Sequence, residues 1–233
     1  MTTQMSSWEF HHSTMKATPI ILTNGRADCF RLMASSLVNV VDIRYGLIVD
    51  DSGSPDYREW LRQQMPGWTV TAVDQDSPAG YSAAMRYVWS LAAGYDFVFL
   101  IEDDFVFEQP VFVSALVEVL IENPHLAQLV LLRQPWFQNE IDHGGLLEAI
   151  EARGVELLRR PEWVEQRATW SCNPTVFRGG QWILNHPWPS GAGSEYRFGQ
   201  ELFKSEPSTV SAWYGVGKTP WVRHVGGRSG FGH

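Results

Sequence analysis

The sequence predicts a single α/β domain with a mostly parallel central sheet flanked by helices. Short apolar runs alternate with segments of helical apolar spacing between residues 18 and 132, a pattern typical of parallel βαβ units. Polar or acidic turns follow several of these runs, as in open sheets that bind ligands at their strand ends. The 233 residues are 44% hydrophobic and 19% charged, which suits one domain with a full core and argues against extended disorder.

The first half of the chain contains five predicted strands and four predicted helices. An Asn24-Gly25 turn closes the first strand, Pro66-Gly67 ends the second helix and Gly94 caps the third. The predicted strands are residues 19–23, 45–49, 68–73, 96–101 and 128–132. The predicted helices are residues 27–38, 57–65, 79–93 and 111–120.

The two ends of the chain give weaker patterns. Residues 1–17 mix Ser, Thr, Met and His without periodicity, which predicts a flexible arm. Residues 134–233 are rich in Trp, Gly and Pro, and only 145–153 and 194–204 have helical spacing. Seven of the 11 tryptophans follow residue 130, and we expect one or two of these at a functional site because most indoles in a small domain belong to the core.

Composition excludes several classes of protein. No apolar run approaches the roughly 18 residues of a membrane span, and we expect a cytoplasmic protein without a leader. Cys29 and Cys172 form neither a CxxC pair nor a zinc spacing, which fits a reducing compartment. The net charge of -8 argues against a general nucleic-acid-coating protein. Residues 170–233 hold 6 Lys and Arg against 3 Asp and Glu, so this quarter can still face an anionic group.

The sharpest chemical signal is the acidic run Glu102-Asp103-Asp104, which follows the apolar strand at residues 96–101. Three adjacent carboxylates repel one another unless a cation compensates them. Ligands that are all oxygen suit a hard cation, Mg²⁺ or Mn²⁺. The alternatives are a solvated acidic turn or a helix N-cap, but the apolar run Phe105-Val106-Phe107 keeps this segment near the core and favours a metal site.

The order and spacing of four segments resemble the nucleotide-sugar half of GT-A glycosyltransferases, particularly the inverting family two. The resemblance covers about residues 18–110. Each segment alone is weakly specific, and their succession carries the match. The matching segments are residues 19–26 (PIILTNGR), 47–54 (LIVDDSGS), 80–86 (GYSAAMR) and 96–104 (DFVFLIEDD).

The resemblance implies one Rossmann-like GT-A domain. Residues 18–132 would bind a nucleoside-diphosphate sugar, with a UDP-sugar as the default, and the Trp/Gly-rich residues 133–233 would bind the acceptor. The acidic turn Asp50-Asp51 matches the family's nucleoside contact, and the polar strand ends can converge on one crevice. A glycine-rich tail, residues 226–232, could close over the diphosphate. The residues expected to bind the donor are Thr23, Asn24, Arg26, Asp50, Asp51, Asp103 and Arg228.

The family's DxD metal motif matches Glu102-x-Asp104, which implies Asp104 as the direct ligand and Glu102 as a second one. Glu102 departs from the family, which has Asp there. Some GT-A enzymes take a further metal ligand from a C-terminal His, and His224 matches that place; a structural role is the alternative. The resemblance therefore implies bound Mn²⁺ or Mg²⁺.

Gly193-Ser194-Glu195 resembles the family's Gly-Glu-Asp motif, whose last acid is the catalytic base. This implies that Glu195 is the base of an inverting transfer, although the segment differs from the motif at two positions. Glu201 is the nearby competitor. A purely structural Glu195, which stabilises the first turn of a helix, is the other alternative.

Two further functions remain open. A nucleotidyltransferase also combines paired acids and Mg²⁺ on an α/β sheet, but it would usually have a Gly-rich, basic loop after the first strand, and Asn24-Gly25-Arg26 is a poor version of one. A non-catalytic module could bind a nucleotide sugar or a glycan without turnover. For a transferase, the acceptor could be a glycan, protein, lipid or modified DNA base, the last being known for small bacteriophage enzymes of this fold.

Overall fold

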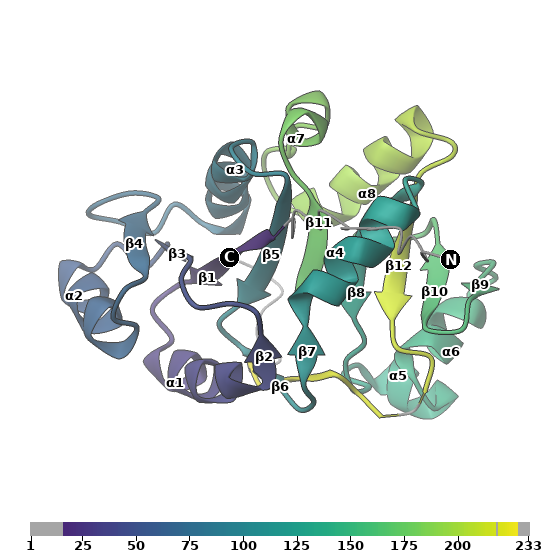
Figure 1. Ribbon diagram of the computed structural model, residues 1–233, viewed down its shortest axis with the longest axis horizontal. Coiled ribbons are helices and arrows are strands. Elements are labelled where there is room, and N and C mark those ends of the chain that lie inside the picture. The colour runs from purple at the N-terminus through teal and green to yellow at the C-terminus, as the bar shows by residue number, and fades with distance from the viewer. Residues whose placement is uncertain (1–15, 218, 228–233) are drawn as a thin grey trace, which may run out of the picture.

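The computed structural model describes residues 16–217 and 219–227, and a long mixed sheet dominates this part of the chain (Figure 1). The strand order is β4-β3-β1-β5-β11-β8-β12-β10-β9. All of these strands except β11 and β10 run in one direction, which confirms the mostly parallel sheet. The strands are β1 (Ala17–Thr23), β3 (Leu47–Asp50), β4 (Thr69–Ala72), β5 (Phe97–Glu102), β8 (Leu126–Leu131), β9 (Leu158–Arg159), β10 (Trp163–Gln166), β11 (Thr175–Arg178) and β12 (Val210–Tyr214).

Helices cover both faces of the sheet, because the side chains of the central strands alternate between two apolar cores. Ile21 and Ile101 belong to the core under α1 (Ala27–Ser36), α2 (Pro55–Gln64) and α4 (Val113–Glu122). Ile20 and Leu100 belong to the opposite core. This second core lies under α3 (Tyr81–Ala92), α7 (Gln181–Asn185) and α8 (Ser194–Ser205).

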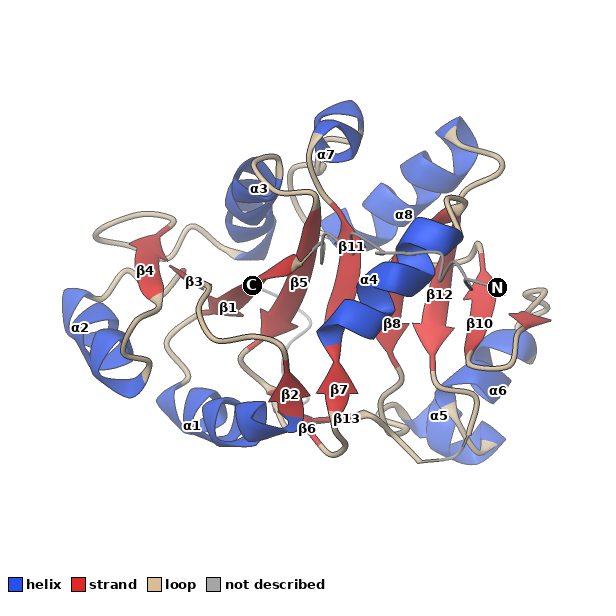
Figure 2. Cartoon of the chain, viewed as in Figure 1, coloured by secondary structure: helices blue, strands red, loops and turns tan. Residues whose placement is uncertain are grey.

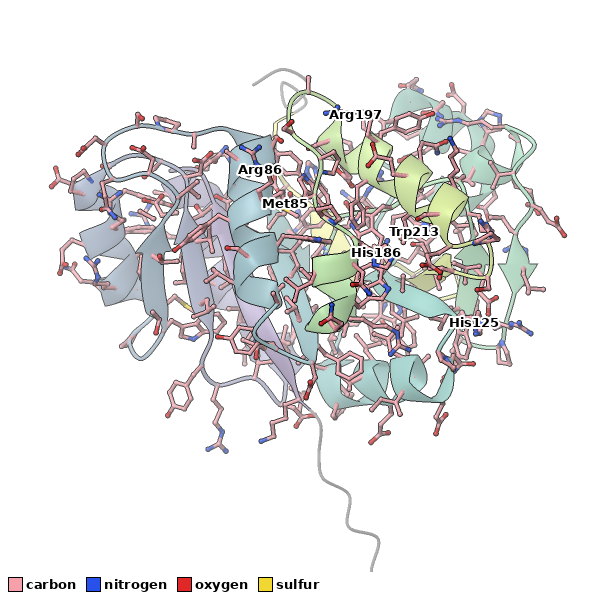
Figure 3. All side chains as sticks on the ribbon, turned by 90° about the horizontal axis from the view of Figure 1, so that it is seen from above. Met85, Arg86, His125, His186, Arg197 and Trp213 are labelled. Atoms are coloured by element: carbon pink, nitrogen blue, oxygen red, sulfur yellow. The ribbon has the colours of Figure 1, made fainter. Side chains whose placement is uncertain are left out.

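Aromatic rings fix α8 against α3 on the second face. Trp89 of α3 stacks on Phe177 of β11 with ring centroids 5.0 Å apart. Trp188 stacks on Phe198 of α8 at 4.9 Å. Figure 3 marks these elements by Met85 on α3, His186 after α7 and Arg197 on α8. Packing of this kind sets the position of the first turn of α8 relative to the sheet.

Two short ladders lie beside the ends of the main strands (Figure 2). In one, β2 (Val40–Val41) pairs with β7 (Val111–Phe112) in parallel. In the other, β6 (Phe105–Phe107) pairs antiparallel with β13 (Val222–His224), so that His224 lies opposite Phe105. The second ladder therefore brings the C-terminal part of the chain next to the acidic run that precedes β6.

Two short helices and one 3-10 turn complete the described elements. A third apolar cluster joins α6 to β8, β10 and β12 through buried residues that include Leu147 and Trp213. The elements are α5 (Gln138–His143), α6 (Leu146–Glu151) and a 3-10 turn at Leu37–Asn39. No helix among the described residues is long and apolar enough to cross a membrane.

The five predicted strands and four predicted helices of the first half are all present, with shifted ends. The predicted arm at residues 1–17 is wrong at Ala17, which begins β1; residues 1–15 lie outside the described part. In the second half, the predicted helices near 145–153 and 194–204 are α6 and α8. The sequence pattern does not predict strands β10, β11 and β12, because each has only four or five residues, three of them buried in a row, and so shows no alternation.

The two predicted halves share one sheet. Strand β11, from the second half, lies between β5 and β8 of the first half and pairs antiparallel with both. Strand β11 therefore connects β5 to β8, and strands of both halves form one continuous sheet.

Candidate active site

The predicted site residues meet at the carboxyl ends of β1, β3 and β5. Here β1 lies between β3 and β5, with Thr23 opposite Asp50 and Leu22 opposite Glu102. The side chains at this edge form two clusters, and the acidic run contributes residues to both. The aspartate side comprises Thr23, Arg26, Asp103, Asp104 and His224, and the glutamate side comprises Tyr81, Glu102, Cys172 and Glu195.

Asp103 is fully buried and accepts hydrogen bonds from two sides. The Thr23 hydroxyl donates to its Oδ2 at 2.6 Å, and the Arg26 guanidinium pairs with its Oδ1. The Tyr57 hydroxyl, from α2, lies 2.8 Å from the Thr23 hydroxyl. Burial raises the pKa of Asp103 to about 6, against the opposing effects of Arg26 and Thr23. Asp103 is thus linked through Thr23 to Tyr57 of α2 and pairs with Arg26.

One carboxylate oxygen of Asp104, Oδ2, is contacted by two other side chains. This oxygen accepts from Arg26 Nη1 at 2.6 Å and lies 3.3 Å from His224 Nε2. Burial alone would raise the pKa of Asp104, but the hydrogen bond of His224 and the charge of Arg26 outweigh it and hold that pKa below its usual value. Asp104 is therefore an ionised, pre-positioned carboxylate.

Gly226 allows the C-terminal segment to pass directly over Asp104. The Val225 amide donates to the Asp104 carbonyl at 2.8 Å. A Cβ on Gly226 would lie 2.5 Å from Asp104 Oδ2 and 3.2 Å from Arg26 Nη1. Any side chain at this position would displace one of these two groups, so glycine is a steric requirement of the site.

His224 is held by aromatic packing and by its backbone. Its ring lies edge-on to Trp136 at 4.3 Å and to Phe105 at 4.8 Å. The Gln134 side chain accepts from the His224 amide and donates to its carbonyl. The buried Nδ1 has no hydrogen-bond partner among the described residues, so no second contact fixes the tautomer of the ring that faces Asp104.

Asp104 and His224 fit two positions of a divalent-cation site. A carboxylate oxygen and an imidazole nitrogen are both suitable ligands for Mn²⁺, and Mg²⁺ is commonly bound by one or two carboxylates together with substrate phosphates. Among the described residues, no group of three or more His, Cys, Asp or Glu side chains could hold a metal. The chain thus offers a pair of ligands, and phosphate oxygens and water would have to complete the coordination.

Glu102 lies on the glutamate side. Strand alternation places it on the same face of β5 as Leu100, which belongs to the α3 and α8 core. Burial raises the pKa of Glu102 well above its usual value, and the nearby charges of Asp104 and Glu195 add to this effect. The charged groups that shift the pKa of Glu102 are therefore mainly other carboxylates.

Glu195 faces the same space from the first turn of α8. Its Oε1 accepts from the Cys172 amide at 2.9 Å, and its Oε2 accepts from the Tyr81 hydroxyl at 3.4 Å. Burial raises the pKa of Glu195, while these two hydrogen bonds oppose the rise. Glu201, the competitor on the same helix, is exposed. A carboxylate with a raised pKa and two fixed partners is suited to accepting a proton.

Asp50 ends β3 and Asp51 follows it, and both accept hydrogen bonds from other parts of the protein. Asp50 accepts from the Ser52 amide at 2.9 Å and pairs with Arg58 at 3.3 Å. Asp51 accepts from the backbone amides of Ala79 and Gly80 at 2.8 and 2.9 Å. The two bonds of Asp51 tie the turn after β3 to the segment that opens α3. The nucleoside contact of this acidic pair stays a prediction.

The structure brings together Thr23, Asn24, Arg26, Asp103, Asp104 and His224. Glu195 lies near enough to Glu102 for its charge to raise the pKa of Glu102. Asn24 accepts from Arg26 Nε at 2.8 Å. Arg228 lies outside the described residues, and Arg223 pairs on the surface with Glu108. Sequence reasoning missed Tyr81 and Cys172 as neighbours of the site. Among the late tryptophans, of which one or two were expected here, Trp136 lies against His224, whereas Trp170 and Trp188 belong to the core.

No family model matches the sequence, and neither does any curated protein. Solved structures match the fold. The crystal structure of GalNAc-T7 with UDP, GalNAc and Mn²⁺ is 8% identical, with a TM-score of 0.63 over 94% of this chain and 45% of its own. TarS residues 1–349 from S. aureus, in complex with UDP-GlcNAc, is 12% identical, with a TM-score of 0.58 over 93% of this chain and 60% of its own.

A third match is CMP:2-keto-3-deoxy-manno-octonic acid synthetase complexed with CTP, which is 13% identical, with a TM-score of 0.51 over 86% of this chain and 90% of its own. This chain spans about half the length of the GalNAc-T7 chain and 60% of the TarS chain. These likenesses establish that the chain has the GT-A fold.

Proposed function

We propose that this chain is a metal-dependent, inverting glycosyltransferase that uses a nucleoside-diphosphate sugar. The observation that carries the proposal is the division of one strand end into two chemically different sides. The aspartate side offers an ionised carboxylate beside an imidazole and a guanidinium. The glutamate side offers a carboxylate of raised pKa that is fixed by two hydrogen bonds. A sugar transfer needs both, since one binds the diphosphate and the other takes a proton.

The aspartate side would bind the donor diphosphate. A divalent cation held by Asp104 and His224 would neutralise the charge that develops on the departing diphosphate. Arg26 is 38% exposed and can donate to a phosphate oxygen. Thr23, Asn24 and Asp103 would position Arg26 through their hydrogen bonds.

Glu195 would act as the general base. Its carboxylate takes the proton of the acceptor hydroxyl while the hydroxyl oxygen attacks the anomeric carbon of the donor sugar. The bond from that carbon to the diphosphate oxygen breaks, and its electron pair leaves with the diphosphate. A single displacement of this kind inverts the anomeric centre. The Cys172 amide and the Tyr81 hydroxyl keep the carboxylate oriented for the proton transfer.

A donor screen tests the proposal. The purified chain is incubated with UDP-, GDP-, CMP- and dTDP-sugars with Mn²⁺, with Mg²⁺ or with EDTA, and release of the nucleotide is measured. UDP-sugars come first because two of the matched structures hold UDP or UDP-GlcNAc. We expect slow, metal-dependent hydrolysis of one donor class, accelerated by the correct glycan, protein, lipid or modified DNA base. Donor binding without hydrolysis or transfer would indicate a non-catalytic binding module.

A nucleotidyltransferase is the second candidate, because the synthetase matched above holds CTP. That reaction starts from a nucleoside triphosphate and releases inorganic pyrophosphate. Pyrophosphate release from a sugar and a nucleoside triphosphate, with no nucleotide released from any nucleotide sugar, would favour this function over glycosyl transfer.

A further inference from the structure

We propose that Arg26 is a built-in counter-cation that a divalent metal ion must displace from Asp104, and that the donor diphosphate provides the new partner of the displaced guanidinium. Arg26 would thereby make metal binding depend on the nucleotide. The proposal rests on the proposed function and adds to it a coupling between the metal ion and the nucleotide.

The contacts of Asp104 Oδ2, the oxygen that faces His224, leave little room for a metal ion there while Arg26 is in place. This oxygen is bound by Arg26 Nη1 at 2.6 Å, lies 3.3 Å from His224 Nε2, and is covered by the backbone at Gly226. Among the described residues, Arg26 is the only Lys or Arg that pairs with Asp103 or Asp104. A metal ion that uses this oxygen and His224 would take the position now held by the guanidinium.

Arg26 can move, whereas its partners cannot. The side chain of Arg26 is 38% exposed, while those of Asp103 and Asp104 are 0% and 9% exposed. Its only other side-chain partner among the described residues is Asn24, which is itself exposed. The guanidinium can therefore turn outward toward solvent without unpacking the core.

Electrostatics then couple the two ligands. Binding of a metal ion alone would break the Arg26–Asp104 ion pair. It would also place a divalent positive charge beside the unpaired guanidinium, and the two charges would repel each other. A nucleoside diphosphate supplies negative charge to both cations. Metal and nucleotide should consequently bind with positive coupling, and the coupling factor must be the same whichever ligand is added first.

Mn²⁺ binding, measured by the electron paramagnetic resonance signal of free Mn²⁺, tests this without reference to activity. The dissociation constant is measured with and without saturating UDP for the wild-type chain, Arg26→Met, Arg26→Lys and Arg223→Met. Arg223 is a matched control, because it forms an exposed ion pair with Glu108 and belongs to the neighbouring β13. Circular dichroism checks the fold of each variant.

We expect weak Mn²⁺ binding to the wild-type chain alone and a clear tightening by UDP. Without UDP, Arg26→Met should bind Mn²⁺ at least about tenfold more tightly than the wild-type chain. UDP should then tighten Mn²⁺ binding to this variant by a smaller factor than in the wild-type chain. Typical coupling factors between two ligands are about 5- to 150-fold. Arg26→Lys, which keeps the charge but not the fork, should lie between the wild-type chain and Arg26→Met. Arg223→Met should behave as wild type.

Equal Mn²⁺ affinities of the wild-type chain and Arg26→Met in the absence of UDP would overturn the role of Arg26. An equal gain in Arg223→Met would also overturn it, because the effect would then be one of overall charge. If Arg26→Met does not fold, the same criterion applies to Arg26→Lys. A wild-type chain that binds neither UDP nor Mn²⁺ in any combination would instead contradict the proposed function.

Discussion

The two sides of the β5 strand end differ in how their carboxylates are compensated. On the aspartate side, Asp104 lies against a guanidinium and an imidazole, which hold its pKa low. On the glutamate side, burial raises the pKa of both Glu102 and Glu195, and the charge of Glu195 adds to the rise at Glu102. The partners of Glu195 are a backbone amide and a phenol, which are neutral.

This difference shows how one strand end can supply two kinds of chemistry. Glu102 and Asp104 are only two residues apart, yet the chain turns between them and their surroundings separate. A carboxylate that stays ionised is suited to binding cations, whereas one with a raised pKa is better suited to taking up a proton. The following predictions test whether the two sides are functionally as distinct as their contacts.

The largest effect is expected from Glu195→Gln. The amide keeps the shape of the side chain but cannot take the proton of the acceptor, so turnover should fall by about two to four orders of magnitude. Donor affinity should stay near that of the wild type, since the aspartate side is unchanged. Turnover and donor binding are measured separately, by product formation and by calorimetry.

The control for this substitution is Glu201→Gln, which changes an exposed acid on the same helix. It should retain wild-type turnover. A loss of turnover in Glu201→Gln, together with normal turnover in Glu195→Gln, would assign the role of base to Glu201. A product with retained anomeric configuration, observed by NMR, would reject the single displacement.

Asp104→Asn and Glu102→Gln separate the two sides by metal binding. Removal of a supporting partner typically lowers metal affinity about 10- to 100-fold, so loss of the direct ligand Asp104 should lower Mn²⁺ affinity in the presence of UDP by at least about 100-fold. Glu102→Gln should leave this affinity within a few-fold of wild type, because Glu102 lies toward Glu195. Both affinities are measured by calorimetry.

The result for Glu102→Gln also tests the DxD assignment made from the sequence. A loss of Mn²⁺ affinity as large as that of Asp104→Asn would show that Glu102 is a ligand after all, and that the division of the site is wrong.

The smallest effect is expected from Tyr81→Phe, and it concerns pH. Glu195 must be ionised to act as a base, and its pKa is raised above 4.5, so kcat/KM should fall toward acid pH with a midpoint above that value. The Tyr81 hydroxyl lowers this pKa, and its removal should therefore move the midpoint further up. A hydrogen bond of about 1 kcal/mol corresponds to less than about one pH unit.

Tyr87→Phe is the matched control, because its hydroxyl contacts Thr71 and it lies on the same helix as Tyr81. Its pH profile of kcat/KM should coincide with that of the wild type. A downward shift in Tyr81→Phe would contradict the assigned direction of the hydrogen bond, and an identical shift in both variants would reject a specific role of Tyr81.

Much of the first half follows from local sequence. Apolar runs such as residues 97–101 specify buried strands, and glycine or proline fixes where helices end. The polar residues that follow β1, β3 and β5 predict a ligand crevice, since parallel strands end at one edge. Residue type alone also indicates that three consecutive acids need compensation. These inferences depend only on neighbours along the chain.

Tertiary structure decided the rest, because it depends on contacts between residues far apart in sequence. Strand β11 enters the sheet between β5 and β8 through pairings that no local pattern encodes. Arg26 lies against Asp104 across 78 positions, and Tyr81 reaches Glu195 across 114. The sequence alone determined that carboxylates end β5, whereas the packing of α1, α8 and β13 determined which of them meets a cation and which meets another acid.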